Sequence, residues 1–88
     1  MGTLRVMYVL KRVESEVARA QAKFKPYNSA HEGHSVIEEE FDELWDEIKN
    51  NKAEGSKERQ MQEALQVAAT AVRFIHDLGS ELLKELPE

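Results

Sequence analysis

Apolar residues recur at helical spacing in three stretches of this 88-residue chain, and this periodicity limits the folds open to it. In the first stretch, over about residues 4–22, the spacing alternates between four and three residues. The stripe consists of Val6, Leu10, Val13, Val17, Ala20 and Phe24. Such a heptad stripe predicts an amphipathic helix that packs on a partner helix. No segment alternates like a β-strand, so the sequence predicts an all-α fold with three helices.

The second and third helices have recognisable starts. Ser29 and Glu32 fit the S-x-x-E capping box, which predicts a helix over about residues 29–49. Ser56 is the expected N-cap of a third helix that runs to about Leu78. We expect Gly79 and the following serine to end or kink this helix, with one or two further turns beyond them.

The apolar faces of these two helices differ in width. On the second helix one stripe is predicted to form core, and its members are Ile37, Phe41, Leu44, Trp45 and Ile48. On the third helix the apolar residues cover about 220° of arc, which is too wide for a helix with one buried face. A chain of this size forms a single domain, here residues 1–88. The other two helices of this domain are too few to cover the whole apolar arc of the third helix. We therefore expect a helical bundle completed by oligomerisation, as a homodimer or homotetramer.

Composition excludes several classes of protein. The chain has no cysteine, so disulfides and thiolate-held metals are ruled out. No apolar run reaches the roughly 20 residues of a membrane span, so we expect a cytoplasmic protein without membrane contact. The net charge of −5 argues against a nucleic-acid polymer as partner. The first 25 residues nevertheless hold six of the 12 basic residues. Such side chains commonly form a solvated helix face, and the alternative prediction is that one of them, Arg12, reaches a substrate phosphate.

A dense acidic segment lies between Glu38 and Glu47, where seven of ten residues are Asp or Glu. Like charges one helical turn apart destabilise a helix, as at Glu39 and Glu43, so solvent, basic side chains or a cation must offset the repulsion. A run of this kind is commonly a solvated face. Carboxylates also suit hard divalent ions, particularly Mg²⁺ in contact with substrate phosphates.

The segments HEGHSVIEEEFDELWDEIK at 31–49 and QMQEALQVAATAVRFIHDL at 60–78 resemble the MazG-like, all-α nucleotide pyrophosphohydrolases. The family pattern is an E-E-x-x-E-L helix followed by a second helix with E-x-x-D. Residues 39–44 match the first element in full, and residues 63–66 match the second except at the last position. The resemblance implies hydrolysis of a nucleoside triphosphate to the monophosphate and pyrophosphate, with Mg²⁺, or Mn²⁺ in its place, as cofactor.

The resemblance also implies roles for individual residues. The catalytic carboxylates would be Glu39, Glu40 and Glu43. The metal ligands would be Glu40, Glu43, Glu63 and Gln66. His31, His34 and Glu47 are predicted to lie beside the bound nucleotide.

Gln66 departs from the family pattern, because the family usually has Asp at this position. The site loses one negative charge, which lowers the expected affinity for Mg²⁺. A second hypothesis follows from this departure. The chain would then be a non-catalytic helical oligomerisation or interaction module that keeps the family fold with a weakened metal site.

Overall fold

The computed structural model describes residues 2–84, and within them the chain is helical without strands. The helices are α1 (Gly2–Lys23), α2 (Ala30–Lys49), α3 (Ser56–Leu78) and α4 (Ser80–Leu83). The predicted all-α class and the extents of the three long helices are confirmed. The count of three is one short, because the turn predicted beyond Gly79 forms the separate single-turn helix α4. The predicted turns beyond residue 84 lie outside the described residues.

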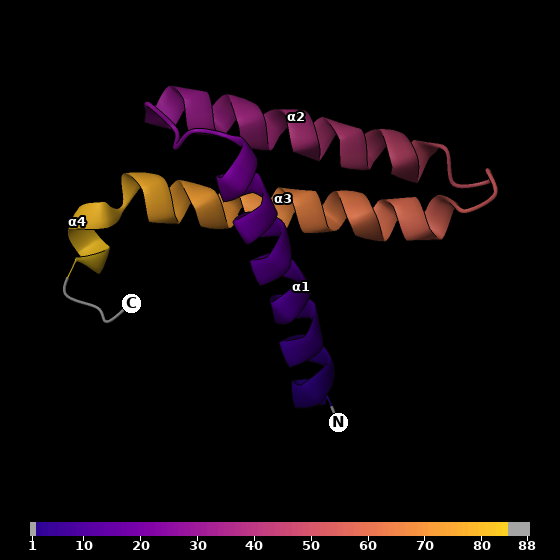
Figure 1. Cartoon of the computed structure of the whole chain (residues 1–88). Helices are drawn as coiled ribbons and strands as arrows, with labels where there is room; N and C mark the ends of the chain where they lie inside the picture. The colour runs from indigo at the N-terminus through magenta and orange to yellow at the C-terminus, as the bar shows by residue number, and fades with distance from the viewer. Residues whose placement is uncertain (1, 85–88) are drawn as a thin grey trace.

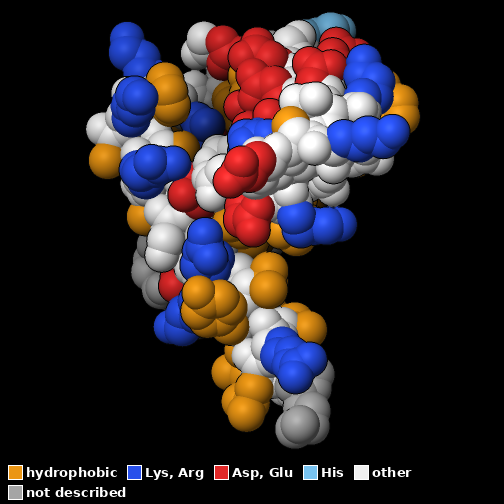
Figure 2. All heavy atoms as spheres, turned by 90° about the vertical axis from the view of Figure 1, so that its right-hand side faces the viewer, with side chains coloured by type: hydrophobic (Ala, Val, Ile, Leu, Met, Phe, Trp, Pro, Cys, Tyr) orange, Lys and Arg blue, Asp and Glu red, His pale blue; other side chains and the backbone are white. Residues whose placement is uncertain are grey.

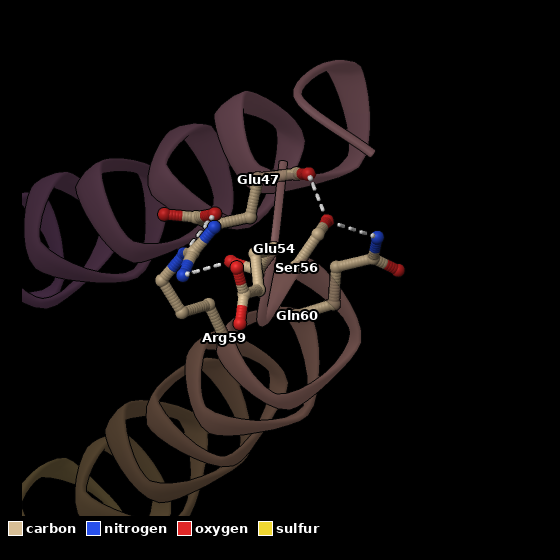
Figure 3. Close-up of polar contacts among 5 residues, drawn as sticks. All are labelled: Glu47, Glu54, Ser56, Arg59 and Gln60. Carbon is tan, nitrogen blue, oxygen red and sulfur yellow. Dashed lines mark hydrogen bonds and ion pairs between the residues drawn. The ribbon is translucent and has the colours of Figure 1, made fainter. Parts of the chain in front are cut away.

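Of the two predicted N-cap residues, Ser29 is confirmed and Ser56 is not. Ser29 is the N-cap of α2, where its Oγ accepts a hydrogen bond of 3.1 Å from the backbone N–H of Glu32. The prediction of Ser56 as N-cap is wrong, because Gly55 holds that position with a left-handed φ of 76°. Ser56 is instead the first residue of α3, and its Oγ donates to the carbonyl of Glu47 at 3.3 Å (Figure 3). This bond ties the start of α3 to the end of α2.

The helices α2 and α3 lie side by side and antiparallel, and α1 crosses α3 (Figure 1). The C-terminal half of α1 packs on α3 through Val13, Val17 and Ala20. The N-terminal half extends away from the helix pair, so Val6 and Leu10 of the predicted stripe are exposed. Phe24 follows the end of α1 and is also exposed.

The face of α3 that packs inside the chain carries a line of polar residues beside the buried Ala69. Every third or fourth residue on it is hydrophilic, and together they form a stripe, hereafter the polar stripe, of Glu63, Gln66, Thr70, Arg73 and Asp77. Thr70 and Arg73 are only 6% and 5% exposed, whereas Ile75 on the apolar side is 58% exposed. The apolar arc of α3 is thus only partly covered in a single chain, because Ala69 is 2% exposed and Phe74 is half-buried, whereas Val72 is exposed.

The predicted core stripe of α2 is only partly covered in this single chain, because Ile37 and Leu44 are half-buried whereas Trp45 is 53% exposed and Phe41 and Ile48 are exposed as well. The reason is that α3 packs on the neighbouring face of α2. Gly33 is buried on that face, and a Cβ placed there would lie 2.5 Å from Cδ2 of Phe74. The close approach at Gly33 therefore turns Glu40 towards α3 in place of Phe41 and Trp45.

Candidate metal centre

Three of the predicted site residues meet between α2 and α3. Glu40 and Glu43 lie one turn apart on α2, and Glu63 belongs to the polar stripe of α3. Each offers a carboxylate oxygen, and these oxygens lie within 4.8 Å of one another. Among the Asp, Glu and His residues of the described part of the chain, this is the one group that meets such a criterion.

The cluster is electrostatically unfavourable when nothing is bound. Burial, followed by the nearby Glu43 carboxylate, raises the pKa of Glu40 to about 7. Burial also raises the pKa of Glu63, and the charges of Glu43 and Glu47 act in the same direction. Oε2 of Glu63 is buried without a hydrogen-bond partner among the described residues. Buried carboxylate oxygens normally have a partner, so this oxygen is available to a ligand that the chain does not provide.

The chemistry of this donor set fits a hard divalent cation. Mg²⁺, Mn²⁺ and Ca²⁺ prefer carboxylate oxygens, and a cation between the three groups would compensate their mutual repulsion. Glu43 is exposed while Glu40 and Glu63 are half-buried, so the cluster opens to solvent on one side. An ion held there would keep free positions for water or a phosphate oxygen.

Gln66, the predicted fourth ligand, is engaged with α1. Its side-chain Nε2 donates a 2.7 Å hydrogen bond to Oε2 of Glu16, and the same oxygen accepts a 2.6 Å bond from Arg19. These two donors lower the pKa of Glu16. The amide at this position therefore anchors α1 to α3, and the family's Asp could not make this contact, since it has no donor when ionised.

The remaining predicted site residues lie outside the cluster. Glu47 forms an ion pair of 2.9 Å with Arg59, next to the α2–α3 connection (Figure 3). His31 and His34 are exposed in the first turns of α2, and His34 is about 9 Å along the helix axis from Glu40. Glu39 is exposed beside Glu40.

Arg12 lines a separate groove between α1 and α3, which Glu39 and Glu40 do not line.

A groove of about 490 Å³ adjoins the cluster. Its walls come from the end of α1, the α1–α2 connection, α2 and the polar stripe, and they include Glu39, Glu40, Tyr27 and Arg73. We refer to it as the polar groove. Acidic side chains gather in the upper part of the molecule, where α2 lies, while hydrophobic ones follow the lower arm formed by α1 (Figure 2).

Sequence reasoning missed Tyr27 and Arg73. Tyr27 is buried, its backbone N–H donates to Asp77 at 3.1 Å and its hydroxyl donates to the carbonyl of Thr70 at 3.3 Å. A signal for Arg73 was present in the sequence. It continues the heptad spacing of Glu63, Gln66 and Thr70, which marks one continuous polar face.

Comparisons of the chain with family models, with curated proteins and with solved structures find no match. Among the described residues, no helix combines the length and the apolar character needed to cross a membrane.

Proposed function

We propose that the chain is a divalent-cation-dependent nucleoside triphosphate pyrophosphohydrolase of the MazG-like type, which releases pyrophosphate and a nucleoside monophosphate. The observation that carries this proposal is the group of Glu40, Glu43 and Glu63, with carboxylate oxygens within 4.8 Å of one another. These are the positions at which the family pattern has its acidic ligands. The unpartnered buried oxygen of Glu63 supports the same assignment.

Each part of the site has a role in this proposal. The three carboxylates would hold Mg²⁺ or Mn²⁺, which when bound neutralises phosphate charge and lowers the pKa of an attacking water. Glu39 is exposed at the edge of the polar groove beside Glu40, where a carboxylate can orient a water by accepting its proton. His31, His34, Glu47 and Arg12 remain predicted substrate contacts.

We further propose that the active form is a homodimer or homotetramer. Phe41 and Trp45 of α2 and Ile75 of α3 are exposed apolar side chains on the two helices that carry the cluster. A second copy packed on these faces would remove them from water and stiffen the helices that hold the carboxylates.

Release of pyrophosphate from a panel of nucleoside triphosphates, with and without Mg²⁺, tests the activity. We expect release only with the ion, and complete loss in Glu63→Gln, which removes the ligand from α3. Glu38→Gln, a neutralisation of an exposed carboxylate outside the cluster, is the matched control and should remain active. Absence of release from every nucleotide in the presence of Mg²⁺ would contradict the proposal.

The alternative function, a non-catalytic interaction module, is favoured by the bond between Gln66 and Glu16. This bond uses the fourth family position to fix α1 rather than to add charge to the cluster. The module predicts a stable oligomer that neither binds Mn²⁺ nor releases pyrophosphate, so the same assay with a sedimentation measurement separates the two functions.

A further inference from the structure

Arg73 is a buried cation that forms no ion pair with an acidic side chain among residues 2–84. Its side chain belongs to the polar stripe, and the residue is 5% exposed. The guanidinium lies over the ring of Tyr27 at 4.6 Å and near the ring of Phe24 at 5.9 Å. Nη2 donates a long hydrogen bond of 3.4 Å to the carbonyl of Lys25, and Nε is buried without a partner among residues 2–84. Buried charges are normally paired, so the guanidinium has unused capacity for an anion.

The acidic group nearest in sequence on the same face does not supply that anion. Asp77 lies one turn further along α3, and no ion pair joins it to Arg73 in the described part of the chain. Its Oδ2 accepts from the backbone N–H of Tyr27, and its Oδ1 contacts Nδ1 of His76 at 2.8 Å. Each oxygen of Asp77 therefore contacts a group other than Arg73.

Arg73 lines the polar groove, which also contains Glu40 of the carboxylate cluster. The groove is lined by two cations, Arg73 and Lys25, and by the carboxylates of Glu32, Glu39 and Glu40. A ligand that fills it must present an anion to the cations and carry a cation to the carboxylates. A phosphate chain with a bound divalent ion satisfies both requirements.

We propose that Arg73 forms an anion subsite for a phosphoryl group of the ligand whose cation is held by Glu40, Glu43 and Glu63. This inference rests on the proposed function and extends it with a residue that binds the phosphate chain. The cation–π contact with the Tyr27 ring restricts the position of the guanidinium, and the planar set of donors of an arginine matches the oxygens of a phosphoryl group. Exclusion of water from the buried side strengthens such charge-assisted bonds.

Calorimetric titration with inorganic tripolyphosphate, added as its Mn²⁺ complex, tests the subsite. We expect Arg73→Gln to bind the complex about tenfold or more weakly than the wild type, and Arg73→Lys to lie between the two, since Lys keeps the charge but not the fork of donors. Lys52→Gln is the matched control, because it removes one positive charge from the exposed α2–α3 connection. Equal affinities of Arg73→Gln and Lys52→Gln would overturn the proposal.

Titration with Mn²⁺ alone separates this inference from the proposed function. Arg73→Gln should bind Mn²⁺ as the wild type does, because Arg73 is not among the cation ligands. If the wild type binds Mn²⁺ but not tripolyphosphate, only the anion subsite fails. If it does not bind Mn²⁺, the proposed function fails, and tripolyphosphate without metal then tests the subsite on the wild type. Binding to the wild type is measured first. Whether the wild type binds Mn²⁺ and tripolyphosphate is therefore known even when a variant fails to fold.

Discussion

Glu40 is the residue at which burial and like charge combine most strongly in this molecule. Its folded-state pKa is about 7, against an ordinary value of 4.5, and the cause is burial followed by the neighbouring Glu43. Between these two pH values the folded chain binds a proton that the unfolded chain has lost. The free energy of unfolding therefore falls as the pH rises from 4.5 to 7. The stabilisation that Glu40 contributes through its raised pKa is fully present only below pH 4.5.

The metal-free protein should accordingly be more stable at about pH 5.5 than at about pH 8, by on the order of 1 kcal/mol once solvent screening is included. Glu40→Gln removes the titration and should flatten this dependence. Glu38→Gln, which neutralises an exposed carboxylate on the same helix, should keep the wild-type profile. Thermal denaturation in chelator across this pH range measures the effect, and identical profiles for both variants would refute the assigned cause.

Gln66 determines how α1 is attached. We expect Gln66→Asp to lower the free energy of unfolding by about 1–3 kcal/mol, because it replaces a donor to Glu16 with a second carboxylate. Adding Glu16→Gln to this variant restores a donor opposite Asp and should recover part of the loss. Urea denaturation of the two single variants and the double variant measures the coupling, and additive effects would show that the two side chains do not interact.

At the scale of the helices, sequence periodicity predicted where each begins and ends but not which face of α2 packs on α3. Trp45 and Phe41 formed the predicted core of α2, yet the structure exposes them. Periodicity identifies an apolar stripe without showing whether the same chain or another subunit covers it. The polar stripe of α3 was visible as heptad spacing, but polar residues are ordinarily assigned to solvent.

The candidate site was likewise predictable only in part from the sequence. The meeting of Glu40, Glu43 and Glu63 was predictable from the motif, because carboxylates at these spacings on two helices can converge. Arg73 was not predicted, since its role depends on Tyr27 from the α1–α2 connection, whose path no local pattern specifies.

Gly33 sets the distance between α2 and α3. Gly33→Ala would place a methyl group 2.5 Å from Cδ2 and 2.9 Å from Cε2 of Phe74, so the helices must separate or the ring must move. Overpacking of this kind costs about 1–3 kcal/mol, which exceeds the gain in helix propensity from Ala. We expect a lower melting temperature and partial recovery when Phe74→Leu is added. An unchanged or raised melting temperature for Gly33→Ala would contradict this account of the contact.

The molecule is less compact than a typical monomeric chain of 88 residues. Its radius of gyration is 14.6 Å, whereas a compact chain of 88 residues has about 12 Å. Its accessible surface is 7143 Å², against about 5,300 Å² for a compact monomer of 10.1 kDa. The difference is larger than the roughly 800 Å² that each partner buries in a standard interface. One chain therefore leaves enough surface exposed for contact with a second copy.

Sedimentation velocity at micromolar concentration should show a dimer or tetramer of the 10.1 kDa chain. Ile75→Lys places a charge on the outward face of α3 and should shift the equilibrium towards the monomer, with loss of thermal stability. Leu82→Lys changes an exposed apolar residue of α4 and is the matched control. A folded 10.1 kDa wild-type species would contradict the proposed assembly.

Glu40, Glu43 and Glu63 are proposed to bind one divalent cation, and a Mn²⁺ titration followed by electron paramagnetic resonance measures this binding. The wild type and Glu38→Gln should bind Mn²⁺ with the same affinity. Glu43→Gln removes one of the three carboxylates and should bind about tenfold or more weakly. Equal affinity in all three proteins would show that the cluster is only a solvated acidic face.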